Sequence, residues 1–480
     1  MQNAITNTTD TIAAIATPPG VGGIGVIRVS GADAFSLVLP LVQRASERTD
    51  VPPSHQLTYA RIVEPATREV LDDVLVAFMH APNTYTRENV VEIQGHGGPL
   101  VLRRMLRAVL AQGARMAQPG EFTLRAFLNG RIDLAQAEAV MDLIGAQTEA
   151  GQRLAVQQLR GKLSEQLQTI RHAILGVIAR IEVSIDFSEE DVPTPQTAEL
   201  LPLIEVAHRH IDQLLAGSEQ GRLYKQGLRT AIIGRPNVGK SSLLNALLRT
   251  ERAIVTSVAG TTRDTVEEVA NLRGVPLHLI DTAGITPTND PIEQIGVQRS
   301  RVAAEGADVV MLVFDGSEPL TEQDRNVCTE VQSMGFESEQ YNNSYSHARP
   351  VIVVINKVDR SLSIEENEVR RLWPTSTLVH ISTRTGVGLP ELEDALAELV
   401  LAGKTVSSES VLVTSTRHQE ALQRVATHLR ASTMSLEQGL PLDFVSIDLR
   451  AAYEALGEVT GETASDDLLD TIFSEFCIGK

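Results

Sequence analysis

The chain has 480 residues, of which 42% are apolar, with a formal net charge of −19 and two cysteines. This size can support about three domains with buried cores. The negative charge disfavours general binding of nucleic acid, so an RNA contact requires a local basic patch or a partner protein. Cys328 and Cys477 fit neither a metal-binding spacing nor a disulfide framework, which suits a reducing cytosol.

We expect no targeting segment and no membrane span. The first twenty residues contain no Lys or Arg, which argues against a signal or transit peptide. The sequence has no run of eighteen consecutive apolar residues, which argues against a transmembrane helix. The expected location is therefore cytoplasmic.

Residues 1–125 combine short β-branched runs with glycine-rich turns, the pattern of an α+β domain. Strands are predicted at residues 11–16, 24–29, 74–78 and 90–94, and a helix at 100–110. Glu92 lies between apolar neighbours in the last strand, either as an exposed strand-face carboxylate or as a functional group. His96 follows in a predicted glycine turn, where a backbone hydrogen bond competes with catalysis as the explanation.

The pattern is helical in residues 126–225 and again in 403–480. Leu and Ile recur at spacings of three and four from Leu159 to Ile185, a stripe that needs partner helices to bury it. A second helix is predicted at about residues 197–215. We expect the two blocks to form one bundle, with residues 226–402 as an inserted domain, because the ends of a domain often lie close together.

The inserted domain begins with an apolar run that leads into Gly234-x-x-x-x-Gly239-Lys240-Ser241, a P-loop between a strand and a helix. Glycines let backbone N–H groups surround phosphate oxygens, and the helix N-terminus favours the anion. Lys240 supplies a positive charge at the outer phosphates. The hydroxyl of Ser241 is suited to bind Mg²⁺.

Two further motifs are typical of the loops that sense the γ-phosphate. In Gly260-Thr-Thr-Arg-Asp264, a threonine hydroxyl can complete the Mg²⁺ shell. Asp281-Thr-Ala-Gly284 places a carboxylate at a strand end, beside the metal. Many GTPases have a water-orienting Gln directly after this motif, but here the residue is Ile285, which cannot position water. Hydrolysis therefore recruits another group or is very slow.

The last two motifs indicate guanine rather than adenine. Asp359, in Asn356-Lys-Val-Asp359, can accept two hydrogen bonds that the guanine edge donates and adenine lacks. Ser382-Thr-Arg384 follows the next strand-like run, where a backbone N–H usually meets the guanine oxygen. The polar stretch 335–347 reads as a surface loop. The predicted GTP-binding residues are Asn237, Val238, Gly239, Lys240, Ser241, Ser242, Thr256, Ser257, Val258, Ala259, Gly260, Thr261, Thr262, Asp281, Thr282, Ala283, Gly284, Asn356, Lys357, Asp359, Ser382, Thr383 and Arg384.

Together with motifs outside the nucleotide domain, these residues make the chain resemble the bacterial tRNA-modification GTPase family MnmE (TrmE) over essentially its whole length. The most specific motifs are Ala16-Thr-Pro-Pro-Gly20, Gln94-Gly-His-Gly-Gly-Pro99, Pro119-Gly-Glu-Phe122, Arg125-Ala-Phe-Leu-Asn-Gly130, Asp133-Leu-Ala-Gln-Ala-Glu138 and Phe476-Cys-Ile-Gly-Lys480. They separate this family from ribosome-assembly GTPases with similar switch motifs.

The resemblance implies an α/β and α multidomain fold, with a folate-binding N-terminal domain, a helical bundle and an inserted P-loop GTPase domain. It implies modification of C5 of the wobble uridine in certain tRNAs by a homodimer, in a heterotetramer with the flavoprotein MnmG (GidA). The one-carbon donor would be a reduced folate, 5,10-methylene- or 5-formyl-tetrahydrofolate. The family's folate contacts correspond to Arg28, Glu92, Arg131 and Lys480. Arg131 replaces the Lys of many members, which preserves charge but not geometry.

The resemblance also implies how hydrolysis proceeds without the usual Gln. Glu293 would orient the water, and Lys240 would act from the P-loop. Mg²⁺ would be bound by Ser241 and Thr262. A K⁺ ion would stabilise developing negative charge where other GTPases use an arginine. Its ligands would be Asn237, Thr256, the carbonyl of Val258 and Thr261. Because these loops would order only when two nucleotide domains meet, activity would depend on dimerisation and on K⁺.

Several alternatives stay open at this stage. The chain could be a regulatory or ribosome-assembly GTPase without one-carbon chemistry. A P-loop ATPase is disfavoured by Asp359. Thr383 stands where Ala is common in the family, and Cys477 could be structural or chemical.

Overall fold

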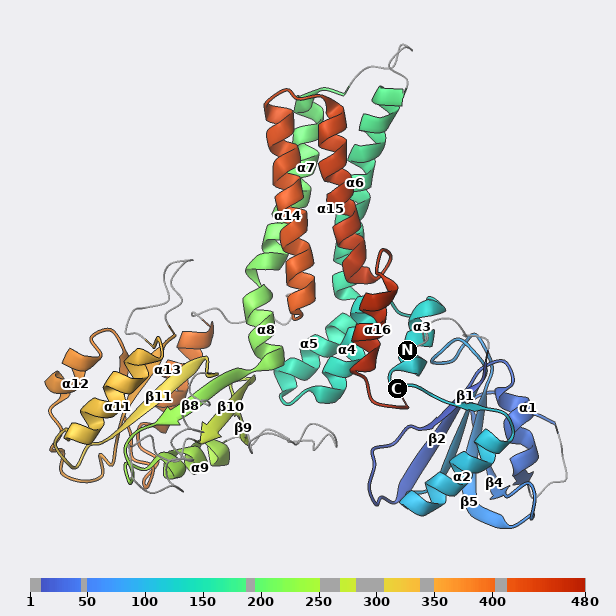
Figure 1. Ribbon diagram of the computed structural model, residues 1–480, viewed down its shortest axis with the longest axis horizontal. Coiled ribbons are helices and arrows are strands. Elements are labelled where there is room, and N and C mark those ends of the chain that lie inside the picture. The colour runs from blue at the N-terminus through green and yellow to red at the C-terminus, as the bar shows by residue number, and fades with distance from the viewer. Residues whose placement is uncertain are drawn as a thin grey trace.

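The computed structural model describes residues 10–44, 50–186, 195–250, 268–281, 306–336, 349–401 and 412–479. These residues form an N-terminal unit on a seven-stranded sheet, a helical unit and a nucleotide unit on a six-stranded sheet (Figure 1). The helical unit stands between the two sheet units, and its long helices project away from both. The predicted combination of α/β and all-α parts is confirmed. Within the described ranges, no helix is long and apolar enough to cross a membrane.

The N-terminal unit has one covered sheet face. Its elements are β1 (Ile12–Ile15), β2 (Ile24–Ser30), α1 (Ala34–Val38), the short helix η2 (Leu39–Leu41), β3 (Val42–Arg44), β4 (Gln56–Val63), β5 (Val70–Met79), β6 (Val90–His96), α2 (Pro99–Ala111), β7 (Arg115–Met116) and α3 (Glu121–Leu128). The strand order is β3-β4-β5-β6-β2-β1-β7, and only the β1–β7 pair is parallel. Alternate strand residues such as Ile27, Val76 and Ile93 are buried in one cluster with Met105 of α2.

The predicted strands of this unit are present, but β3, β4 and β7 were not predicted. The predicted turn at residues 95–98 is wrong at its start, because Gly95 and His96 still belong to β6. The ring Nδ1 of His96 lies 2.7 Å from Oδ1 of Asp72. The hydrogen bond to Asp72 accounts for His96 without a catalytic role.

The nucleotide unit has a sheet that is buried on both faces. Its elements are β8 (Leu228–Ile233), α9 (Lys240–Thr250), β9 (Glu268–Leu272), β10 (Val275–Asp281), β11 (Val309–Asp315), α11 (Glu322–Ser333), β12 (Val351–Asn356), α12 (Glu366–Leu372), β13 (Thr377–His380) and α13 (Leu389–Leu401). The order is β13-β12-β11-β8-β10-β9, and only β9 and β10 pair antiparallel. Alternate residues of β11 enter two separate cores, Met311 in one and Leu312 in the other. This burial explains the continuous apolar runs in the sequence.

The helical unit joins segments from both sides of the nucleotide unit. Its helices are α4 (Leu134–Gly145), α5 (Glu149–Leu159), α6 (Lys162–Asp186), α7 (Thr197–Ala216), α8 (Ser218–Gln226), α14 (Thr416–Glu437), α15 (Leu442–Thr460) and α16 (Asp466–Ser474). Residues of α6, α7, α14 and α15 share one buried core, with Ile174 and Leu429 among them. Figure 1 shows these four helices side by side.

The predicted apolar stripe is interrupted at one end and exposed at the other. Gly161, with φ of +81°, separates α5 from α6, so Leu159 belongs to the shorter helix and not to the long one. Ile185, near the end of α6, is 37% exposed. The six members in between, from Leu163 to Ile181, lie in the shared core.

The tip of the β9–β10 hairpin is attached to the base of the helical unit. Oγ1 of Thr148, which caps α5, donates a hydrogen bond of 2.7 Å to the carbonyl of Gly274. Gly274 has φ of +95°, and a Cβ there would lie 2.8 Å from the Cβ of Ala150. Tyr224 of α8 and Val275 pack in one small apolar cluster beside this turn. Two separate contacts thus connect the nucleotide sheet to α5 and α8.

Candidate functional site

The P-loop connects β8 to α9 and is curled around its own lysine. Lys240 is 8% exposed, and its Nζ donates hydrogen bonds to the carbonyls of Gly234 (2.8 Å) and Arg235 (2.9 Å). Asn237 has φ of +69° at the tip of the loop. Ser241 is exposed in the first turn of α9. The N–H groups of this turn and the lysine form the positive surroundings that a phosphate chain requires.

Gly239 is the position in this loop where a side chain cannot be accommodated. Its φ is +105°, and a Cβ there would lie 2.2 Å from Nδ2 of Asn356. Asn356 is fully buried at the end of β12, where Nδ2 donates to the carbonyl of Val238 (2.8 Å) and Oδ1 accepts from the N–H of Thr383 (3.2 Å). One amide side chain therefore connects the P-loop to the last guanine motif.

Asp359 is held as an acceptor at the outer end of this site. The buried hydroxyl of Ser382 donates a hydrogen bond of 2.7 Å to its Oδ1. That hydrogen bond is the main reason that the pKa of Asp359 lies below its usual value. The carboxylate is therefore ionised at neutral pH, as acceptance of two N–H groups from a guanine requires.

Asp315 is a site residue that the sequence reasoning missed. It ends β11, and its Oδ2 accepts a hydrogen bond of 2.5 Å from Nζ of Lys357, which also donates to the carbonyl of Asn237 (2.8 Å). Although partial burial raises the pKa of Asp315, the hydrogen bond from Lys357 brings it below its usual value. The signal that could have found it is a carboxylate directly after a buried strand, the same signal that marked Asp281.

Several predicted residues fall outside the described part of the chain. They are Thr256, Ser257, Val258, Ala259, Gly260, Thr261, Thr262, Thr282, Ala283, Gly284, Glu293 and Lys480. Asp281 is the last residue of β10, which is parallel to β8, the strand that leads into the P-loop. The assignments of a water-orienting carboxylate and of K⁺ and Mg²⁺ ligands from these loops stay predictions.

In the N-terminal unit, Arg28 and Glu92 are neighbours across two strands. They are register partners on β2 and β6, and Nε and Nη2 of Arg28 both lie 2.9 Å from Oε1 of Glu92. The guanidinium carbon of Arg28 also lies 5.6 Å from the ring centre of Tyr85 and 5.7 Å from that of Phe122. Both side chains of the ion pair are about a quarter exposed, so the pair is open to a ligand.

Arg131 joins this group through Tyr85. Its guanidinium carbon is 5.1 Å from the centre of the Tyr85 ring, and its Nη1 donates to the carbonyl of Thr84 (2.7 Å). Arg28 and Arg131 thus lie on one aromatic ring, which the sequence reasoning did not single out, and Glu92 is connected to it through its ion pair with Arg28. The fourth predicted folate residue, Lys480, is not described.

The last described residues run beside the same sheet. Ile478 bridges Pro119, and the N–H of Gly120 donates to the carbonyl of Cys477 (3.4 Å). Gly479 has φ of +97°, and a Cβ there would lie 2.4 Å from the carbonyl oxygen of Ile15. Cys477 is an exposed free thiol. The tail therefore lies against β1, the strand next to the one that carries Arg28.

Comparisons with known proteins match nearly the whole chain. A family model described as "GTP-binding protein TrmE N-terminus" matches residues 11–131, and one described as "MnmE helical domain" matches residues 134–477. A tRNA modification GTPase MnmE from Alkaliphilus oremlandii is 45% identical over 98% of this chain and 99% of its own length. The protein of the same name from Lactiplantibacillus plantarum is 46% identical over 98% of both chains.

Solved structures match a smaller part of the chain. Era of Aquifex aeolicus, in a crystal structure bound to GDP·AlF4⁻, is 28% identical, with 42% of this chain and 65% of that chain covered and a TM-score of 0.27. The G domain of the FeoB iron transporter of T. maritima is 27% identical, with 36% of this chain and 98% of that chain covered and a TM-score of 0.27.

Proposed function

The chain belongs to the MnmE family of tRNA modification GTPases, and from this premise we propose that it hydrolyses GTP to modify C5 of the wobble uridine in certain tRNAs. The product would be an aminomethyl or carboxymethylaminomethyl group, formed with a flavoprotein of the MnmG type. The observation that carries the GTP assignment is the hydrogen bond from buried Ser382 to Asp359, which orients a carboxylate for the guanine edge. The expected location is the cytoplasm.

Each part of the nucleotide has a counterpart in this chain. The carboxylate of Asp359 accepts from the base, and the P-loop with Lys240 surrounds the phosphates. Gly239, with φ of +105°, adopts a backbone conformation that side chains rarely allow, which fits a loop whose N–H groups surround a phosphate chain. Mg²⁺, bound by Ser241 and Thr262, would neutralise charge on the outer phosphates.

The catalytic proposal assigns the water to Glu293, since Ile285 cannot orient it. Asn237, Thr256, the carbonyl of Val258 and Thr261 would bind K⁺. The test is the rate of GTP hydrolysis in KCl and in NaCl at equal ionic strength, with Glu293→Ala in parallel. Equal rates in the two salts, or an active Glu293→Ala, would refute this mechanism and leave the GTP assignment unaffected.

The N-terminal site is proposed to bind a reduced folate, which supplies the one-carbon unit. Arg28 donates only to Oε1 of Glu92, and Oε2 accepts no hydrogen bond from the described residues. That oxygen is free to accept N–H groups of a pterin. The rings of Tyr85 and Phe122 supply apolar contact area, and Arg131 supplies positive charge for the carboxylates of the ligand. Lys480 is proposed to act near the same site.

Homodimerisation through the N-terminal unit is supported by the uncovered face of its sheet. Leu57, Tyr59 and Leu75 are 57%, 59% and 40% exposed on adjacent strands. Leu57 lies in the same cross-strand row as Glu92 and Arg28, with Ala77 between. A second copy would cover this apolar surface beside the folate site. Sedimentation of the wild-type protein and of Leu57→Lys would test it, with a monomeric variant as the expected result.

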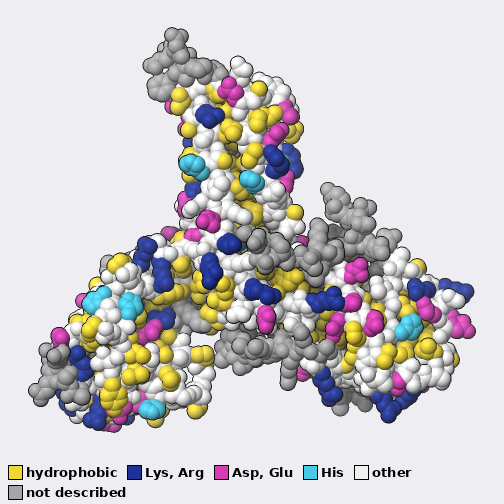
Figure 2. All heavy atoms as spheres, turned by 180° about the vertical axis from the view of Figure 1, so that it is seen from behind, with side chains coloured by type: hydrophobic (Ala, Val, Ile, Leu, Met, Phe, Trp, Pro, Cys, Tyr) yellow, Lys and Arg dark blue, Asp and Glu magenta, His cyan; other side chains and the backbone are white. Residues whose placement is uncertain are grey.

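The acidic chain still offers a basic surface to tRNA. Figure 2 shows Lys and Arg side chains gathered in a band across the base of the helical unit. Such a band supports contact with phosphate groups despite the net charge of −19.

The decisive experiment is mass spectrometry of wobble uridines in tRNA from a strain that lacks this gene. We expect C5-modified uridines to disappear and to return with the wild-type gene. Unchanged uridines in the deletion strain would favour a regulatory or ribosome-assembly GTPase without one-carbon chemistry.

A further inference from the structure

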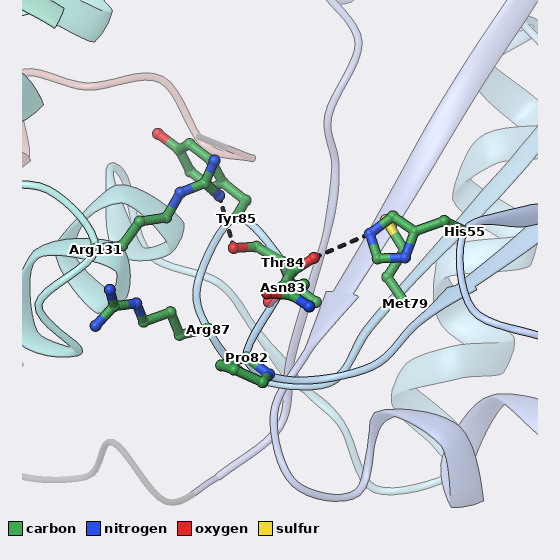
Figure 3. A pocket seen from close by; sticks show the side chains of 8 residues that line it. All are labelled: His55, Met79, Pro82, Asn83, Thr84, Tyr85, Arg87 and Arg131. Carbon is green, nitrogen blue, oxygen red and sulfur yellow. Dashed lines mark hydrogen bonds between the residues drawn. The ribbon is translucent and has the colours of Figure 1, made fainter. Parts of the chain in front are cut away.

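A hollow of 730 Å³ opens beside Tyr85 in the N-terminal unit. It is lined by the loop of residues 82–87, together with His55, Met79 and Arg131. Figure 3 shows the guanidinium groups of Arg87 and Arg131 on one side of it and the ring of His55 on the other. No Asp or Glu is among the lining residues.

The two arginines are fixed in place but not neutralised. Nη1 of Arg131 donates to the carbonyl of Thr84 (2.7 Å), and Nη1 of Arg87 donates to the carbonyl of Asn129 (2.9 Å). Within the described residues, neither guanidinium forms an ion pair with a carboxylate. A backbone carbonyl orients a guanidinium without cancelling its charge, and four N–H donors of each group remain for a ligand. The hollow therefore presents two oriented cations.

One residue of this loop has a strained backbone conformation. Arg87 has φ of +60°, a left-handed conformation that residues other than glycine seldom adopt. His55 uses both ring nitrogens within the protein: Nε2 lies 2.9 Å from the carbonyl oxygen of Asn83, and Nδ1 lies 2.7 Å from Oγ of Ser54. His55 thus supports the loop, and the arginines are the anion-binding groups. Strained residues of this kind are typical of ligand-binding loops.

We propose that this hollow binds the carboxylates of a chain of γ-linked glutamates attached to the folate. The inference rests on the proposed folate site and extends it. Because the ring of Tyr85 contacts the guanidiniums of both Arg28 and Arg131, a ligand with its pterin at Glu92 passes this ring and reaches Arg131 and then Arg87. A single glutamate occupies the first of these cations, and further glutamates occupy the second. An RNA phosphate is the competing anion, but the two cations follow one another along the path that leads away from the folate site, which favours the glutamate chain.

The test is calorimetry on the full-length protein with the mono- and triglutamate forms of 5-formyl-tetrahydrofolate. We expect the triglutamate to bind the wild type at least fivefold more tightly, and this ratio to fall towards one in Arg87→Gln. Arg87→Lys, which retains the charge without the planar fork, should keep part of the preference. Arg103→Gln is the matched control, because Arg103 is also exposed and bonded to a backbone carbonyl, that of Pro99, but lies on α2.

Each outcome separates this inference from the folate assignment beneath it. Equal affinity of the wild type for the two ligands overturns the tail site and leaves the folate site intact. No binding of either ligand overturns the folate site itself. An equal loss of preference in Arg103→Gln assigns the effect to overall charge and overturns the inference. If Arg87→Gln weakens tRNA binding but keeps the tail preference, the hollow is an RNA contact and the inference is wrong. Thermal melting of each variant verifies that it is folded.

Discussion

The nucleotide site and the N-terminal site are built in different ways. In the nucleotide site, loops that directly follow parallel strands approach one another, and backbone groups of Val238 and Thr383 meet around the buried amide of Asn356. In the N-terminal site, Arg28 of β2 and Arg131, which follows α3, lie on the ring of Tyr85, and Glu92 of β6 pairs with Arg28. The first site combines backbone conformation with a few side chains that follow strands, and the second consists of side chains alone. Substitutions should therefore affect the two sites differently.

The largest effect is expected for Gly239→Ala. The added Cβ would lie 2.2 Å from Nδ2 of Asn356 and would force that side chain to move. The alanine itself would be strained at φ of +105°. Strain of about 1–3 kcal/mol and the loss of two buried hydrogen bonds, at about 1–3 kcal/mol each, predict a loss of GTP affinity of about 1,000-fold. Nucleotide titration measures it. The control is Gly176→Ala on α6, where no atom lies within 4 Å of the new Cβ. GTP binding near the wild-type level in Gly239→Ala would mean that the site does not depend on its backbone.

A smaller but more specific effect is expected for Asp359→Asn. The amide offers a donor where guanine also donates, so one charge-assisted hydrogen bond of about 1.5–3 kcal/mol is lost and the other no longer has a charged acceptor. GTP affinity should fall about 100-fold, and affinity for xanthine nucleotides should rise. Competition binding with GTP and XTP measures both changes. Glu322→Gln, which removes an exposed charge from α11, serves as the control, and unchanged GTP affinity in Asp359→Asn would refute the guanine assignment.

For the side-chain site, Glu92→Ala should weaken binding of 5-formyl-tetrahydrofolate by about 1–3 kcal/mol, the usual loss when a polar group loses its hydrogen-bond partner. Calorimetry measures the change. Asp73→Ala is a matched control, because Asp73 also pairs with an arginine across two strands of this sheet, Arg61 at 3.1 Å. If both substitutions weaken folate binding equally, the effect belongs to the sheet as a whole and not to Glu92.

The smallest effect is expected for Thr383→Ala. Thr383 contributes its backbone N–H to Asn356, and no hydrogen bond from its hydroxyl is formed within the described residues. GTP affinity should change by less than about 0.5 kcal/mol, the usual range for substitutions away from specific contacts. Ser382→Ala is the contrast, since it removes the hydroxyl that donates to Asp359. A large effect of Thr383→Ala would show that the Thr383 side chain, and not only its backbone N–H, contributes to the site.

This difference in construction also explains what the sequence could predict. The P-loop and the Asn356–Asp359 motif were identified because their residues are contiguous and follow apolar runs. Asp315 was missed because its role depends on Lys357, 42 residues further along the chain. Tyr85 and Arg87 lie in a loop without periodicity, and their roles depend on contacts with Arg28, Arg131 and Asn129. The break at Gly161 was missed because the apolar spacing continues across it.

The attachment of the β9–β10 hairpin to Thr148 connects the γ-phosphate motifs to the helical unit. The two strands have five and seven residues, so at about 3.4 Å per residue the hairpin is roughly 20 Å long. The tip of the hairpin contacts α5 and α8. Its open end continues in the sequence into segments 251–267 and 282–305, which contain the two γ-phosphate motifs. The hairpin is therefore a third connection between the nucleotide unit and the base of the helices, in addition to the two chain connections. It is the connection that leads directly to the segments of the γ-phosphate motifs.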